Sequence, residues 1–104
     1  MKIATSIEQG KALLELGIDR STADMYWWYA EDKYYLYVGK PKDENAIPAW
    51  SLGMLLELLS IEINDNTIDI TGEDGYWYIQ YGLHLYGEKK PDLLDAVVET
   101  FKEI

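Results

Sequence analysis

Cysteine is absent from this sequence of 104 residues, and histidine occurs only once. Without cysteine the chain can form no disulfide and offers no thiolate to zinc, so its composition gives no support to secretion. No apolar run is long enough to span a bilayer, and the first residues lack the apolar segment that is typical of a signal peptide. We therefore expect a cytoplasmic protein that does not associate with membranes.

Basic residues are also scarce. Nineteen acidic residues stand against nine basic ones, which gives a formal net charge of −10, and residues 53–104 hold eleven of the acids but only three of the bases. A negative field repels the phosphates of nucleic acids and anionic lipids, so we expect no direct nucleic-acid partner. The acidic surplus could equally do no more than keep a small protein soluble.

Recognisable catalytic patterns are missing as well. His84 is the only histidine, and none of the serines lies in a G-x-S-x-G motif. The acidic segment 65–74 offers carboxylates but lacks the spacing and the closing glutamate of an EF-hand loop. We therefore expect no catalytic residue, no metal site and no cofactor, and we interpret the chain as a protein that is not an enzyme.

What the sequence does contain is the composition of one compact globular domain that spans residues 1–104: 48% apolar and 27% charged residues. Thr5 is a predicted helix cap, with Glu8 placed to complete a capping box. Gly17 suits a left-handed helix end, after which Ile18 can fold back on the last turn. Pro91 suits a first helical position. Apolar periodicity predicts three helices, over residues 6–16, 51–59 and 91–103.

The remaining periodic segments favour strands, because they are short, alternate in polarity and are rich in aromatic and β-branched residues. Residues 61–63 are a further strand candidate, and a loop is predicted over 40–48. The order of elements, α-β-β-α-β-β-β-α, predicts an α+β fold with three helices and a small, mostly antiparallel sheet of four to five strands. The main predicted strands are 25–30 and 34–39, which form a hairpin, and 67–71, 76–81 and 83–86.

Aromatic side chains are concentrated in one place. Residues 25–39 hold seven of the fourteen aromatics of the chain, all of them Tyr or Trp. Strand alternation puts Leu36 and Val38 on one face, which we expect to be the core. A second set of aromatics then lies on the opposite face, and it forms an open stripe unless a helix or the loop at Trp50 covers it. This set is Tyr26, Trp28, Tyr35, Tyr37, Tyr76 and Tyr78.

Three functional hypotheses follow. Tyr and Trp concentrate in binding hot spots, so the aromatic stripe predicts an interaction protein that binds a protein partner or a second copy of itself. The alternative is an acidic regulator or decoy, which resembles a nucleic acid or acts as an antitoxin does, and which uses the acidic C-terminal half. The third is a small enzyme or a sugar-binding module that uses the aromatics as a platform. The acidic face of the alternative comprises Asp92, Asp95, Glu99 and Glu103.

Several segments carry a resemblance: "TSIEQGKALLELGID", "TADMYWWY", "LYVGKP", "IPAWSLGMLLELL" and "LLDA". In these segments the chain is similar to a family of short proteins that are abundant in gut Bacteroidales genomes and in their prophages and mobile elements. The chain departs from the family at Arg20, where proline is common, and in a shorter strand region before the last helix. The resemblance implies a cytoplasmic, single-domain protein, and it implies no activity and no functional residues.

A weaker likeness concerns residues 67–104. A strand, a "DGYW" entry to a second strand and a final helix that opens near "DLLDAV" are similar in layout to HicB-type antitoxins. The Pro-Asp-Leu-Pro-Gly-Cys signature of those proteins is absent, so this likeness extends only to the fold pattern.

Overall fold

The computed structural model describes residues 2–63, 69–73, 75–81, 84–90 and 92–103. It confirms an α+β fold with three helices and antiparallel strands. In chain order the elements are α1 (Ile7–Glu15), the short 3₁₀ helix η1 (Arg20–Thr22), β1 (Met25–Ala30), β2 (Lys33–Val38), β3 (Ile47–Ala49), α2 (Leu52–Ile63), β4 (Asp69–Glu73), β5 (Tyr76–Tyr81), β6 (His84–Lys90) and α3 (Leu93–Glu103).

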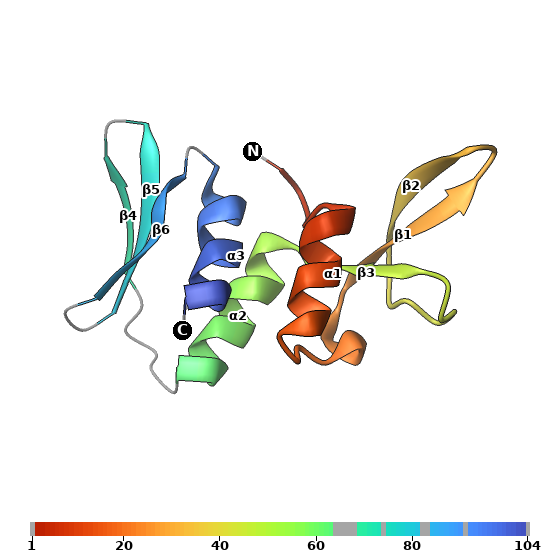
Figure 1. Cartoon of the computed structure of the whole chain (residues 1–104), viewed down its shortest axis with the longest axis horizontal. Helices are drawn as coiled ribbons and strands as arrows, with labels where there is room; N and C mark the ends of the chain where they lie inside the picture. The colour runs from red at the N-terminus through yellow and green to blue at the C-terminus, as the bar shows by residue number, and fades with distance from the viewer. Residues whose placement is uncertain (1, 64–68, 74, 82–83, 91, 104) are drawn as a thin grey trace.

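The strands form two separate sheets instead of the single sheet of four to five strands that the sequence predicted. One sheet has the order β2-β1-β3 and the other β4-β5-β6, and every pairing is antiparallel. The three helices lie between the two sheets (Figure 1). Helix α3 packs on β5 and β6, whereas α1 packs on β3. Alternation in a sequence identifies strands but not their partners, which is why the division was not predicted.

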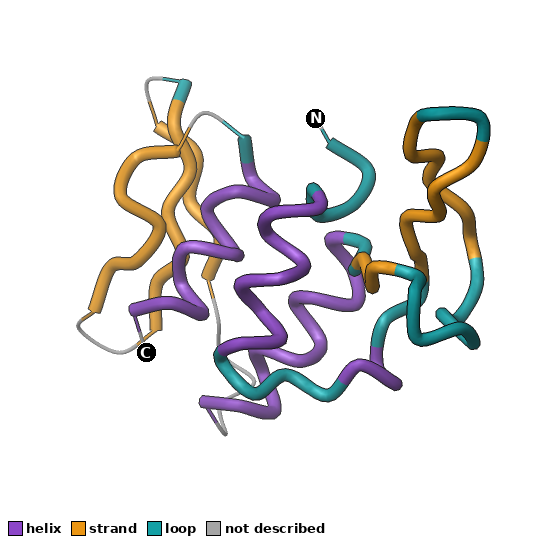
Figure 2. The backbone as a smooth tube through the Cα atoms, turned by 45° about the vertical axis from the view of Figure 1, so that its right-hand side comes forward, coloured by secondary structure: helices purple, strands orange, loops and turns teal. Residues whose placement is uncertain are grey.

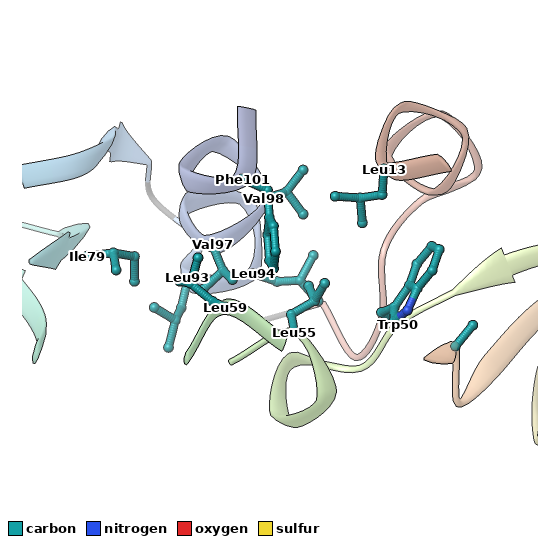
Figure 3. Packing of buried hydrophobic residues seen from close by; sticks show 11 residues of the cluster. Leu13, Trp50, Leu55, Leu59, Ile79, Leu93, Leu94, Val97, Val98 and Phe101 are labelled. Atoms are coloured by element: carbon teal, nitrogen blue, oxygen red, sulfur yellow. The ribbon is translucent and has the colours of Figure 1, made fainter. Parts of the chain in front are cut away.

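The main core lies among the helices and against the second sheet (Figure 3). Each helix contributes an apolar stripe, as the periodicity of the three segments predicted. Trp50, in the connection between β3 and α2, is fully buried, and its indole N–H donates a hydrogen bond to the Thr22 hydroxyl over 3.0 Å. The largest fully buried apolar side chains are Trp50, Leu13, Leu55, Leu59, Ile79, Leu94, Val97 and Val98.

The cap of α1 differs from the prediction by one residue. The Ser6 hydroxyl accepts a hydrogen bond from the Gln9 amide, and the Gln9 side chain accepts one from the Ser6 amide, so these two residues form the capping box. Thr5 and Glu8 were the predicted pair. Thr5 is instead buried, and its hydroxyl accepts a hydrogen bond from the Trp50 amide over 3.1 Å.

Three further boundaries differ from the predictions. The predicted loop over 40–48 gives way to β3, which begins at residue 47 and pairs with β1. Residues 61–63 are the last turn of α2 and not a strand, because no glycine or proline interrupts the helix there. Helix α3 begins at Leu93, where Asp92 accepts a hydrogen bond from the Leu94 amide over 2.9 Å. Pro91, the predicted first helical residue, lies outside the described residues.

Candidate functional site

The aromatic segment forms the predicted hairpin. Its two-residue turn consists of Glu31 and Asp32, which both have positive φ angles, 52° and 67°, as a type I′ turn requires. The register places Trp28 opposite Tyr35 and Tyr26 opposite Tyr37. We call the face of the first sheet that carries these four side chains the aromatic face: Tyr26, Trp28, Tyr35 and Tyr37.

The structure brings together only four of the six predicted aromatic residues. Tyr76 and Tyr78 belong to β5, in the other sheet, and the helices separate the two sheets (Figure 1). The expectation of one continuous stripe is therefore wrong. Tyr76 is 43% exposed, whereas the side chain of Tyr78 lies outside what the structure describes.

A hollow of about 440 Å³ lies beside the aromatic face. Three of the predicted residues form one of its walls, and residues between Val38, the last residue of β2, and Ala46 form the other. Apart from Gly39 and the two prolines that bracket the loop, no local pattern indicates this second wall. We call the hollow the aromatic pocket, and its lining residues are Tyr26, Trp28, Tyr37, Val38, Gly39, Lys40, Lys42, Asp43 and Ala46.

Two tyrosines in the aromatic pocket stack on each other. The ring centroids of Tyr26 and Tyr37 are 5.5 Å apart, and the ring planes differ by 19°. The chain then turns away from β2 at Gly39, where φ is +137° and a side chain would be strained. The Gly39 amide donates a hydrogen bond to the Asp24 carbonyl over 2.9 Å, which fixes the start of the second wall against the hairpin.

Arg20 holds the far end of that wall. Its guanidinium Nη2 donates hydrogen bonds to the carbonyl oxygens of Asp43 and Ala46, over 2.5 Å and 2.7 Å. One charged group thereby holds two residues of the loop that lines the aromatic pocket, and hydrogen bonds from a charged donor are stronger than neutral ones. Sequence reasoning assigned no role to Arg20, although it is the only arginine in the chain.

The opposite face of the hairpin was expected to be the core, and this is correct at one end only. Met25 is buried and packs with Ala4 and Ala49. Val38, on the same face, is 85% exposed. The helices reach the first sheet at β3, so the outer part of the β1–β2 hairpin projects beyond them (Figure 2).

The acidic residues of the alternative hypothesis lie on or next to α3, and several are engaged within the chain. The Asp92 carboxylate accepts hydrogen bonds from the backbone amides of Lys2 and Leu94. The Asp95 carboxylate lies 3.0 Å from the Lys2 ammonium and accepts a hydrogen bond from the side-chain Nε2 of Gln9 over 2.7 Å. Glu99 pairs with the lysine three residues on over 3.8 Å, and Glu103 is exposed. Asp92 and Asp95 thus hold α3 against the N-terminal segment and α1.

Within the described ranges, no group of three or more His, Cys, Asp or Glu side chains is placed to hold a metal ion. No helix in that part of the chain is long and apolar enough to cross a membrane. No protein-family model matches the sequence, and comparisons with curated proteins and with solved structures found no match either.

Proposed function

We propose that this chain is a cytoplasmic interaction protein that captures a partner protein through the aromatic pocket. The observation that carries the proposal is the pocket itself: two tyrosines and a tryptophan line a hollow of about 440 Å³ on a hairpin that projects from the core. The partner places an apolar or aromatic side chain of an exposed segment between the Tyr and Trp side chains and the loop.

The physical chemistry of the lining supports this assignment. Tyr and Trp bury a large area at little cost in rotamer entropy, and their polar groups tolerate water when the site is empty. The volume also lies in the range of about 300–1,000 Å³ that is usual for binding pockets. Tyr37 remains 43% exposed although it stacks on Tyr26, so its ring is accessible to a partner.

A sugar-binding platform uses similar aromatics but needs polar side chains that converge beside a free ring face. Asp43 is the one carboxylate among the residues that line the aromatic pocket, and no side-chain amide is among them. The facing surfaces of Tyr26 and Tyr37 are also covered by their mutual stacking. The lining therefore favours a protein segment over a glycan.

The test is selection from a phage-displayed library of random twelve-residue peptides on the immobilised protein. The affinity of an enriched peptide is then compared for the wild type, Tyr37→Ser and Tyr29→Ser. Loss of a hot-spot aromatic costs about 2 kcal/mol, so we expect Tyr37→Ser to weaken binding about 30-fold. Tyr29→Ser should bind as the wild type does.

Tyr29 is a matched control. It lies in the same hairpin on the opposite face, is 55% exposed, and its ring pairs with Tyr34 at a centroid distance of 5.1 Å. Equal melting temperatures of the two variants would show that both fold. The proposal is wrong if no peptide is enriched over an uncoated surface, or if both variants lose affinity equally. Binding of glycans from an array, lost in Tyr37→Ser, would favour the sugar-binding alternative.

A further inference from the structure

Strand β2 is the outer strand of the first sheet. The hydrogen-bond pattern between β2 and β1 shows which backbone N–H and C=O groups of β2 point toward the open edge. The Gly39 amide donates to the Asp24 carbonyl, and the register pairs residues whose numbers sum to 63. Hydrogen-bonded and non-bonded pairs alternate in an antiparallel ladder, so Tyr35 and Tyr37 bond to β1. The N–H and C=O groups of the intervening residues 34, 36 and 38 therefore point away from β1, toward the open edge.

This edge lacks the usual protection against pairing. It contains no proline and no bulge between residues 33 and 38. Its single lysine, Lys33, lies over the Tyr35 ring, with Nζ 5.1 Å from the centroid, and so belongs to the aromatic face. The side chains that accompany the outward groups are apolar or aromatic, and Tyr34 and Val38 are 42% and 85% exposed.

The edge is also complementary to itself. When two copies of β2 run antiparallel about a two-fold axis at Leu36, Tyr34 faces Val38 of the second copy and Tyr35 faces Tyr37 of the second copy. Residues 34, 36 and 38, whose N–H and C=O groups point outward, then all lie in hydrogen-bonded pairs with the second copy. An antiparallel ladder requires this alternation. Aromatic and β-branched residues that face each other stabilise such a ladder.

The charges that flank β2 have the same symmetry. Glu31 and Asp32 precede the strand, whereas Lys40 and Lys42 follow it, and all four side chains are exposed. The ion pairs in the described part of the chain, Lys2–Asp95 and Glu99–Lys102, involve none of these four. Lys40 Nζ donates a hydrogen bond to the Ser21 carbonyl oxygen over 3.3 Å, and in the dimer this ammonium turns to the acidic residues of the second copy. In the antiparallel pair each acidic turn meets the lysines of the other copy, so opposite charges meet at both ends.

We infer that the free edge of β2 binds a second copy of this chain, which joins the two β2-β1-β3 sheets into one six-stranded sheet across a two-fold axis. This interface goes beyond the proposed function and does not depend on it. A two-fold interface must complement itself, which is the property that the sequence from residue 31 to residue 42 has. An unrelated partner strand would not require that symmetry.

Charge reversal tests the arrangement without touching the core. One variant carries Glu31→Lys and Asp32→Lys, and the other carries Lys40→Glu and Lys42→Glu. By sedimentation equilibrium from about 5 μM to 1 mM, the wild type should dimerise, and each variant alone should dimerise at least tenfold more weakly because like charges meet at both ends. An equimolar mixture of the two variants should restore the dimer as a heterodimer, since every contact is then attractive.

Amide hydrogen exchange gives the second measurement. As the concentration rises, the amides of residues 34, 36 and 38 should become protected, while those of Tyr35 and Tyr37 are protected at all concentrations. A wild type that stays monomeric to 1 mM, or a dimer in which these three amides stay unprotected, overturns the inference. The mixed-variant heterodimer and the binding of selected peptides are read separately, so failure of this interface and failure of the aromatic pocket can be told apart.

Discussion

Two helical glycines offer a direct test of how the hairpin is attached to the helices. Gly10, in α1, is buried against β3, and a Cβ added there would overlap the carbonyl oxygen of Pro48. Gly53, near the start of α2, is exposed, and a Cβ added there would meet nothing within 4 Å. Alanine at either position gains up to about 1 kcal/mol of helix propensity. Only Gly10→Ala must also separate α1 from β3.

The Pro48 carbonyl belongs to the backbone of β3 and cannot rotate away. Overpacking of this kind costs about 1–3 kcal/mol, and we take the upper end, which leaves Gly10→Ala about 2 kcal/mol less stable than the wild type. For a domain of this size the loss lowers the melting temperature by about 10 °C. Chemical denaturation at low protein concentration measures the free energy of unfolding of both variants. A Gly10→Ala protein that is as stable as Gly53→Ala would refute the close packing of α1 on β3.

Three further outcomes are expected. Asp24→Ala should cost about 2–3 kcal/mol of unfolding free energy, because the Asp24 carboxylate accepts hydrogen bonds from the Ser51 amide and hydroxyl over 2.9 Å and 2.5 Å; urea denaturation measures it. Glu31→Asn with Asp32→Gly should stabilise the hairpin by about 1 kcal/mol, since asparagine and glycine adopt positive φ more easily; a lower midpoint of urea denaturation would contradict this. Hydrogen bonds from the Ser21 amide and hydroxyl hold the pKa of Asp19 below its ordinary 3.8, so an NMR titration should give a lower value. The ionised form is the stabilising one, and its contribution is present above about pH 4 and disappears as the pH falls through the folded-state pKa.

Local signals in the sequence predicted local structure well. The end of α1 is confirmed: Gly17 has a φ of +93°, and the Ile18 amide donates to the Leu13 carbonyl over 3.1 Å. The hairpin of residues 25–39 is confirmed in its strands and turn. Both features depend on residues close together in the chain, so composition and spacing are enough to define them.

The parts that were not predicted depend on partners distant in the sequence. Strand β3 spans only residues 47–49 and contains Pro48, so it exists through its pairing with β1 and not through its own propensity. The assignment of β5 to a second sheet likewise depends on where α3 packs. The aromatic pocket needs Arg20 to hold a loop more than twenty residues away, and no local pattern indicates such a contact.

The two proposed surfaces share one hairpin and are compatible in geometry. A two-fold axis perpendicular to the sheet keeps the aromatic faces of both copies on the same side, since residues that face each other across an antiparallel pair point the same way. A dimer would therefore present two aromatic pockets to one side. A partner with two binding segments would gain avidity from such an arrangement without any additional contact.

Mapping of a selected peptide onto the protein by NMR chemical shifts shows directly whether the aromatic pocket binds it. With the wild type at low concentration, we expect the largest changes on the Trp28 indole N–H and on the amides of Tyr26, Tyr37 and Gly39. The amide of Tyr29, on the other face of the hairpin, should change little. If the changes instead concentrate on α3 or on β5, the aromatic pocket is not the binding site.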